Sequence, residues 1–257
     1  MNQKEEVTRR DLLSDAGTKR QAAVSVDDVP KHIAVIMDGN RRYGKAKYGS
    51  ATKGHWDGSR TLVDFCKWCI AEHVQTLTVY AFSTENWSRP PDEVASLMAI
   101  FCKYCDELRI EAIQRNIRIH VLSTDTSQIP SPVKVAMRRM VEQTAHCNGF
   151  VLNICLSYGS RGEIVTACQN IACSVKDGTL EPAEISESVI NGQLLTQSDP
   201  DVVIRTSGEY RISNFLLWQL AYAELFFIKK TWPEMRQTDL VDVIQTFARG
   251  RQRRFGK

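Results

Sequence analysis

The sequence predicts a single α/β domain with a mostly parallel central sheet of about six strands flanked by helices. Short apolar runs alternate along the chain with longer segments whose apolar residues recur at helical spacing. The chain has 257 residues, and 43% of them are hydrophobic, which is enough for a substantial core. No linker, repeat or low-complexity tract follows Lys31. We therefore expect one domain over residues 30–257, preceded by a polar N-terminal arm over residues 1–29.

The strands are expected where apolar runs are short and rich in β-branched residues. The first run, IAVIM at 33–37, has no polar residue, which is typical of a strand buried on both faces of a parallel sheet. The predicted strands cover residues 33–37, 76–82, 117–122, 150–156, 202–205 and 225–228.

Amphipathic segments between and after these runs predict helices, because their apolar residues recur at three- and four-residue spacing. The predicted helices cover residues 55–73, 92–115, 132–146, 161–176, 183–195 and 238–249. Two CxxC pairs, at 66–69 and 102–105, lie inside the first two helices. Such pairs can bind zinc, but zinc sites of this kind usually form in glycine-rich turns, which are missing around these pairs. We interpret the four cysteines as small buried hydrophobic residues.

Composition and hydropathy argue against several classes of protein. The net charge of +3 gives no support for a nucleic-acid partner, and we expect none. The N-terminus lacks the apolar segment of a secretory signal. The apolar stretch at 220–228 is interrupted by Glu224 and is too short to span a bilayer. We expect a cytoplasmic protein; peripheral contact with a membrane surface, that of the endoplasmic reticulum in a eukaryote, stays open.

The end of the first strand carries the clearest chemical signal. Asp38-Gly39-Asn40 favours a tight turn, and Asn40 is suited to cap a helix that follows. Free backbone N–H groups at such a helix start attract an anion such as phosphate, and Arg41 and Arg42 add forked donors. A carboxylate at Asp38 would repel phosphate unless a cation lies between them, which suggests Mg²⁺. The alternative is an ordinary loop followed by a solvated basic helix.

Three further predicted strands end in similar loops. Small hydroxyl or glycine residues and at least one arginine follow the strands at 76–82, 150–156 and 202–205. Ligands of parallel α/β sheets bind beyond the carboxyl ends of the strands, so four such loops on one rim predict a site for more than one phosphate group. The alternative is that arginine is simply common in loops. The nucleotide motifs GxxxxGK[ST] and GxGxxG are missing, as is a DDxxD aspartate box.

These segments resemble the signature regions of the cis-prenyltransferases, most closely the homodimeric undecaprenyl diphosphate synthases. The matching segments are HIAVIMDGNRRYGK at 32–45, YAFSTENWSRP at 80–90, SYGSRGEIV at 157–165 and DVVIRTSGEYRISNFLLWQLAYAELFF at 201–227. The resemblance runs from about Lys31 to the C-terminus. It implies Mg²⁺-dependent addition of isopentenyl diphosphate units to an allylic diphosphate, with farnesyl diphosphate expected, each addition forming a cis double bond. The product would be a long-chain polyprenyl diphosphate for dolichol or a bacterial-type lipid carrier.

The resemblance also implies roles for individual residues of the allylic site and of the catalytic machinery. Asp38 is the implied magnesium ligand, His55 assists departure of the diphosphate, and Ser83 and Asn86 help to remove a proton. Trp87, grouped with the allylic site, orders the isopentenyl group near the reacting carbons. The allylic diphosphate is implied to bind Gly39, Asn40, Arg41, Arg42 and Arg89.

The second diphosphate and the metal have their own implied residues. Isopentenyl diphosphate is implied to bind Arg205, Arg211, Ser213, Arg254 and Gly256. The last two belong to an R-x-G tail that reaches into the neighbouring subunit's site, which implies a homodimer. Glu224 is implied to join Asp38 in the magnesium region, and the alternative for this carboxylate is a buried salt bridge.

Two positions depart from the family pattern, and one alternative function stays open. Ala51 and Tyr210 stand where bacterial members often carry an arginine and a histidine, which puts allylic affinity and the metal ligands in doubt. The alternative is a non-catalytic regulatory subunit of the same fold. The presence of Asp38 and of the arginines argues against it, because such subunits usually lose them.

Overall fold

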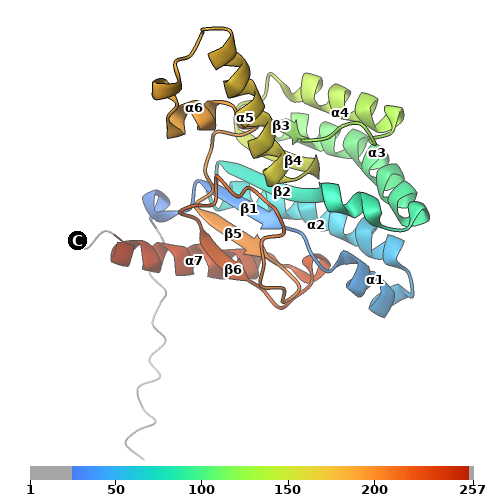
Figure 1. Ribbon diagram of the computed structural model, residues 1–257. Coiled ribbons are helices and arrows are strands. Elements are labelled where there is room, and N and C mark those ends of the chain that lie inside the picture. The colour runs from blue at the N-terminus through green and yellow to red at the C-terminus, as the bar shows by residue number, and fades with distance from the viewer. Residues whose placement is uncertain (1–24, 255–257) are drawn as a thin grey trace, which may run out of the picture.

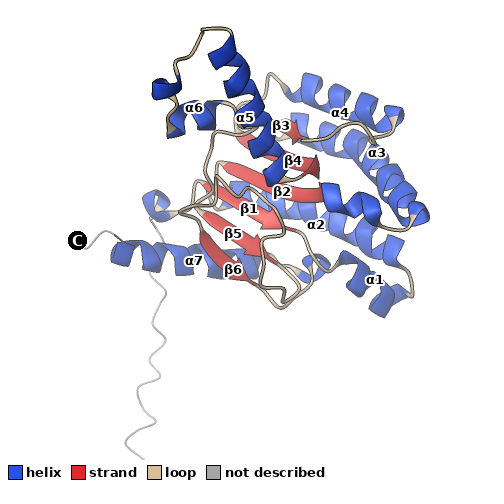
Figure 2. Ribbon diagram, viewed as in Figure 1, coloured by secondary structure: helices blue, strands red, loops and turns tan. Residues whose placement is uncertain are grey.

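The protein has a six-stranded sheet between two layers of helices (Figures 1 and 2). The computed structural model describes residues 25–254. All strand pairs are parallel, and the spatial order is β3-β4-β2-β1-β5-β6. The strands are β1 (His32–Ile36), β2 (Thr76–Ser83), β3 (Ile117–Leu122), β4 (Phe150–Tyr158), β5 (Val202–Arg205) and β6 (Glu224–Phe227). The prediction of a mostly parallel α/β sheet of about six strands is confirmed.

The helices divide between the two faces of the sheet. They are α1 (Asn40–Tyr48), α2 (Ala51–Ala71), α3 (Pro91–Gln114), α4 (Ser131–Thr144), α5 (Ser160–Lys176), α6 (Glu187–Gly192) and α7 (Gln237–Arg254), with short 3₁₀ turns η1 (Val26–Asp28), η2 (Thr84–Ser88), η3 (Pro182–Glu184) and η4 (Trp232–Glu234). Helices α2, α3, α4 and α7 pack on one face around the largest core cluster. Helix α5 and the segment 212–223 lie on the other. No helix in the part described is long and apolar enough to cross a membrane.

The predicted helix at 183–195 is largely wrong. The structure has the 3₁₀ turn η3 followed by the short helix α6. The turn η3 ends at Glu184, and Ser186 is the N-cap of α6, because its hydroxyl accepts a hydrogen bond from the backbone N–H of Val189 at 3.4 Å. A capping serine inside an apolar pattern therefore divided the segment into two short pieces.

The cysteines of the two CxxC pairs lie on helices, as expected. Cys66, Cys69 and Cys105 are buried in the main core cluster. Burial raises the pKa of the Cys66 and Cys105 thiols to about 12, so both stay protonated at neutral pH. They pack as small apolar side chains.

Candidate active site

The loop after β1 turns sharply at Gly39. This residue has a φ of 98°, and a Cβ there would lie 2.7 Å from Ser207 Oγ and from Thr231 Cβ. Glycine is required both by the backbone conformation and by the close approach of these neighbours. Gly39, not Asn40, is the N-cap of α1, so the predicted capping role of Asn40 is wrong. Asn40 is the first helical residue, and its Nδ2 donates to the Met37 carbonyl at 3.1 Å.

The Asp38 carboxylate is held by residues that follow β1 and by Arg205 of the neighbouring strand β5. Its Oδ1 accepts from the Gly39 N–H at 2.7 Å, and its Oδ2 accepts from Arg205 Nη2 at 2.9 Å. The Arg42 guanidinium lies 3.6 Å from Oδ1, in an i,i+4 ion pair. The backbone carbonyl of Asp38 accepts from the Thr206 hydroxyl at 2.7 Å. The carboxylate is therefore fixed in orientation while its side chain keeps 30% exposure toward the cleft.

Arg205 connects the Asp38 loop to the segment after β5. Its side chain is only 4% exposed. One nitrogen, Nη2, bonds Asp38, and the other, Nη1, donates to Ser213 Oγ at 2.8 Å and to the Arg211 carbonyl. The planar fork of arginine makes these contacts simultaneously. Arg211 itself is exposed and pairs with Glu209, which also lies 3.5 Å from Arg42.

The loop after β2 is ordered by its own side chains. Ser83 starts η2, and Asn86 Oδ1 accepts from the Ser83 N–H at 3.1 Å. Trp87 packs edge-to-face on Phe82 with ring centroids 4.8 Å apart, and its Nε1 donates to Ser157 Oγ at 2.8 Å. This loop thus rests on β4, and the two polar side chains of Ser83 and Asn86 stay at the rim.

Two arginines share one carboxylate that the sequence analysis did not single out. Glu93 Oε2 lies 3.2 Å from Arg41 Nη1, and Glu93 Oε1 lies 3.4 Å from Arg89 Nη1. Glu93 stands in the first turn of α3, where a carboxylate is favoured by the helix dipole. It joins α1 to the loop after β2 and keeps both guanidinium groups at the mouth of the cleft.

These loops enclose a cleft with a cavity volume of about 670 Å³ at the carboxyl ends of the strands. Most of the predicted site residues line it. They are Asp38, Gly39, Asn40, Arg41, Arg42, His55, Ser83, Asn86, Arg89, Arg205, Arg211 and Ser213. Trp87 lies behind the wall against Phe82 rather than on it. Gly256 and the side chain of Arg254 lie outside the described part of the chain.

His55 occupies the junction of this cleft with a second, apolar cavity. Burial is the main cause that lowers the pKa of His55 to about 4, and the positive charges of Arg89 and Arg41 lower it further. The imidazole is therefore neutral at pH 7 and carries one N–H donor. Its buried Nε2 has no hydrogen-bond partner within residues 25–254. The neutral His55 imidazole can thus donate or accept a hydrogen bond at the junction of the polar cleft and the apolar cavity.

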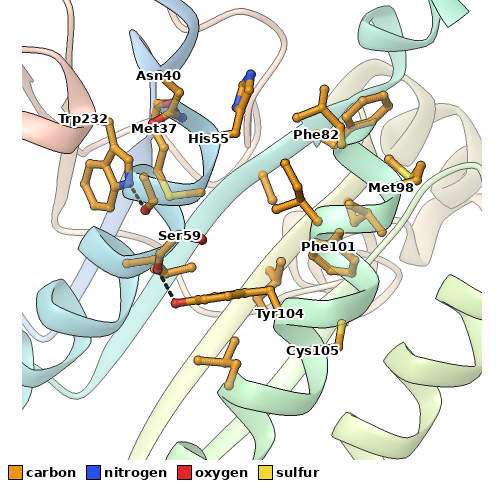
Figure 3. A pocket seen from close by; sticks show the side chains of 18 of the residues that line it. Met37, Asn40, His55, Ser59, Phe82, Met98, Phe101, Tyr104, Cys105 and Trp232 are labelled. Atoms are coloured by element: carbon orange, nitrogen blue, oxygen red, sulfur yellow. Dashed lines mark hydrogen bonds between the residues drawn. The ribbon is translucent and has the colours of Figure 1, made fainter. Parts of the chain in front are cut away.

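The apolar cavity has a volume of about 110 Å³ and lies between α2, α3 and the sheet (Figure 3). Met37, Asn40, His55, Ala81, Phe82 and Leu97 line both cavities. Tyr104 of α3 crosses the apolar cavity and donates its hydroxyl hydrogen bond to the Ser59 carbonyl of α2, as Figure 3 shows. A ligand with a charged head and a hydrocarbon tail fits such a pair of adjoining cavities.

Glu224 does not lie beside Asp38 within one protomer, and its predicted part in the magnesium region stays a prediction. Glu224 begins β6 and pairs in register with Val202, at the amino ends of the strands. Asp38 follows the carboxyl end of β1. The side chain of Glu224 approaches Gly250 of α7 instead. Tyr210, which stands where bacterial members often carry a histidine, is 69% exposed and packs on Phe227 with ring centroids 5.3 Å apart.

Comparison with known proteins decides the family. Residues 36–256 match the family model described as "Putative undecaprenyl diphosphate synthase". The chain belongs to the undecaprenyl diphosphate synthase family of cis-prenyltransferases. It is 40% identical to a ditrans,polycis-undecaprenyl-diphosphate synthase of Lactiplantibacillus plantarum over 95% of both chains. It is 42% identical to a geranylgeranyl-diphosphate-specific tritrans,polycis-undecaprenyl-diphosphate synthase of Thermococcus kodakarensis, over 91% of this chain and 89% of the relative.

Solved structures agree with this membership. Lavandulyl diphosphate synthase of Lavandula x intermedia, solved with dimethylallyl diphosphate, superposes with a TM-score of 0.83 at 29% identity, over 86% of this chain and 96% of that one. A probable undecaprenyl diphosphate synthase of Campylobacter jejuni gives 0.73 at 32% identity, over 89% and 99%. The predicted cis-prenyltransferase activity is confirmed, and cis-prenyl chain elongation is favoured over a regulatory subunit.

Proposed function

We propose that the polar cleft condenses isopentenyl diphosphate with an allylic diphosphate, and that the apolar cavity receives the growing chain. The observation that carries this proposal is the Arg205 fork, which joins the Asp38 loop to Ser213 in one cleft. Two anion-binding groups meet there, one on the loop 38–42 and one on 205–213. Two diphosphates held side by side are what a prenyl condensation needs.

In this reaction the allylic C1–O bond breaks and C1 bonds to C4 of isopentenyl diphosphate. A proton then leaves C2, and the departing diphosphate is the base that we propose. Arg41, Arg42 and Arg89 would bind the diphosphate while its negative charge grows. Neutral His55 would donate its N–H to the same group from the boundary of the apolar cavity. Ser83 and Asn86 would orient the isopentenyl carbons from the opposite wall.

The Asp38 carboxylate suits Mg²⁺ as a single protein ligand. Mg²⁺ is usually held by one or two carboxylates together with phosphate oxygens and water. Asp38 is partly exposed to the cleft and fixed by Gly39 and Arg205, so it can face a bound diphosphate without reorganising. When bound, Mg²⁺ would supply positive charge to the departing diphosphate. No cluster of three His, Cys, Asp or Glu side chains capable of holding a metal lies within the described residues, which fits a site completed by substrate.

The test is incorporation of radiolabelled isopentenyl diphosphate into polyprenols, primed by farnesyl or geranylgeranyl diphosphate. Relatives specific for each primer resemble this chain almost equally, so both are assayed. We expect a ladder of products with Mg²⁺ and none with EDTA. Full incorporation in the presence of EDTA would contradict the proposed metal dependence.

Tyr104 is proposed to limit product length. An apolar cavity of about 150 Å³ holds one benzene molecule, so the 110 Å³ present here has room for roughly one isoprene unit, and the cavity has to widen to receive the rest of a farnesyl or longer chain. Replacing Tyr104 by alanine removes the ring that crosses the cavity, and we expect the ladder to shift by one or more units toward longer products. Tyr104→Phe keeps the ring and should leave the ladder unchanged. A ladder unaltered in Tyr104→Ala would contradict this role; chromatographic sizing decides.

A homodimer is proposed through the outer edge of β6. Tyr222 is 93% exposed, Leu225 48% and Tyr210 69%, and all three flank this edge strand, where an unpaired strand favours association. Helix α7 ends at Arg254 near the amino ends of the strands, because its Gly250 lies beside Glu224. The tail would therefore start far from its own cleft, which supports a role in the partner's site. A long polyprenyl product would also favour peripheral contact with a membrane surface.

We expect Leu225→Arg to convert the dimer into a monomer, because a buried unpaired charge at such an edge is costly. Light scattering after gel filtration measures the mass. Val165→Arg is the matched control, since Val165 is similarly exposed at 56% on α5, away from this edge. A Leu225→Arg protein that remains dimeric at micromolar concentration would argue against this interface.

A further inference from the structure

The segment 213–216, which carries Ser213, has a strained backbone. Ser213, Asn214 and Leu216 have φ values of 50°, 62° and 46°, although none is glycine. Left-handed conformations cost free energy for such residues, and they persist only where the surroundings fix them. The segment also borders the cleft, because Ser213 and Asn214 line it. Its geometry therefore depends on the contacts that hold it.

Some of these contacts anchor the segment to the sheet. The Tyr80 hydroxyl of β2 donates to the Ser213 carbonyl at 3.3 Å, and the Tyr80 ring stacks on Phe215 with centroids 4.6 Å apart. Ser160 at the start of α5 accepts from the Leu217 N–H at 2.9 Å. These contacts fix the segment to β2 and to the start of α5. The contacts between the segment and the other loops of the cleft are made by a different residue.

Asn214 is the residue that joins the segment to the other loops of the rim. Its Oδ1 accepts from the Arg161 N–H at 2.9 Å, and its carbonyl accepts from the Ser160 N–H at 2.8 Å. Its Nδ2 donates to Glu85 Oε1 at 3.0 Å. Gly159 permits this approach, since a Cβ there would lie 2.7 Å from Asn214 Nδ2. One amide thus connects the loops after β2, β4 and β5.

We propose that Asn214 is a positioning residue that couples the isopentenyl diphosphate site to the catalytic loop 84–88 through its hydrogen bond to Glu85. This proposal rests on the proposed binding of isopentenyl diphosphate by Arg205, Arg211 and Ser213. Asn214 holds Ser213 in its strained conformation and fixes the loop that carries Asn86 at the same time. Loss of the bond lets the two loops move independently.

The hydrogen bond between Asn214 and Glu85 can be tested by exchanging the side-chain amide and the side-chain carboxylate between the two positions. In Asn214→Asp, two carboxylates face each other, and the donor is lost while the acceptor for Arg161 remains. In Glu85→Gln, the Asn214 amide can still donate to the Gln carbonyl. In the double variant Asn214→Asp with Glu85→Gln, the Gln amide donates to the Asp carboxylate, so one hydrogen bond and the net charge are restored. The double variant is therefore the matched control for the single one.

The measurement is steady-state kinetics for each substrate, together with the melting temperature. For Asn214→Ala we expect the KM for isopentenyl diphosphate to rise about tenfold, the effect of losing one hydrogen bond. The KM for the allylic substrate should stay within about twofold. Asn214→Asp should be more impaired than Asn214→Ala, Glu85→Gln close to wild type, and the double variant within about threefold of wild type. This pattern would support the coupling.

Two results would overturn the proposal. One is an Asn214→Ala protein whose KM for isopentenyl diphosphate is unchanged, and the other is a double variant no more active than Asn214→Asp. Arg211 is an exposed residue of the proposed isopentenyl diphosphate site. The Arg211→Ala variant therefore tests the site separately from the coupling through Asn214. If Arg211→Ala raises this KM and Asn214→Ala does not, only the coupling fails. If neither raises it, the assignment of the isopentenyl site fails as well.

Discussion

Replacing Asp38 by alanine is expected to lower kcat about a thousandfold, with incorporation no longer dependent on Mg²⁺. The substitution removes the only carboxylate on the loop 38–42, where the departing diphosphate is proposed to bind. Removal of one preorganised electrostatic group from such a site typically costs about 100- to 1000-fold, and loss of the metal adds to it. The measurement is kcat from steady-state incorporation with saturating substrates and Mg²⁺.

Two control variants separate charge from shape. Asp38→Asn keeps the volume and loses the negative charge, so it should be nearly as inactive as Asp38→Ala. Asp57→Ala removes a carboxylate of α2 that accepts from the Tyr48 hydroxyl at 2.8 Å and does not line the cleft. We expect it to retain wild-type kcat within about twofold. An Asp38→Ala enzyme with kcat within tenfold of wild type would contradict the assigned role.

The second large effect is expected for Arg205→Lys, with kcat/KM for isopentenyl diphosphate reduced about a hundredfold. The guanidinium reaches Asp38 Oδ2 and Ser213 Oγ with separate nitrogens. A lysine ammonium at this 4% exposed position cannot reach both, so one partner is left without its donor inside the cleft wall. Steady-state kinetics with the allylic substrate at saturation measures the loss.

Arg118→Lys is the matched control for this conservative change. Arg118 is exposed on β3, at the opposite edge of the sheet, and we expect its replacement to leave kcat/KM unchanged. A circular dichroism melt verifies that the Arg205→Lys protein is folded. Retention of kcat/KM within about threefold in a folded Arg205→Lys protein would show that the fork does not bind the diphosphate.

The cleft could be predicted from sequence because parallel strands present their carboxyl ends at one edge. The loops after the strands at 33–37, 76–82 and 202–205 were therefore expected to meet, and Asp38, Arg89 and Arg205 do line one cleft. Their arginines mark an anion site by residue type alone. The individual roles of His55 and Ser213 came from the resemblance to the family, since nothing in a lone histidine or serine specifies them.

Other features could not be predicted because they depend on tertiary contacts. Glu93 follows Pro90 and Pro91 like any first-turn carboxylate, and only the fold brings Arg41 from α1 beside it. Asn214 acts through loops that are distant in sequence. Glu224 was placed near the metal by resemblance, but its position at the amino end of β6 puts it at the opposite end of the sheet in its own chain. The local sequence around a residue does not specify which distant loop packs beside it in the folded chain.

The most direct test of the central claim is a crystal structure with Mn²⁺, a non-hydrolysable farnesyl thiodiphosphate and isopentenyl diphosphate. The account predicts an anomalous peak about 2.0–2.2 Å from an Asp38 carboxylate oxygen, bridged to the thiodiphosphate on the loop 38–42. It predicts the farnesyl chain in the cavity beside Tyr104 and the second diphosphate on Arg205, Arg211 and Ser213. A metal peak away from Asp38, or the farnesyl chain outside the cavity, would contradict it.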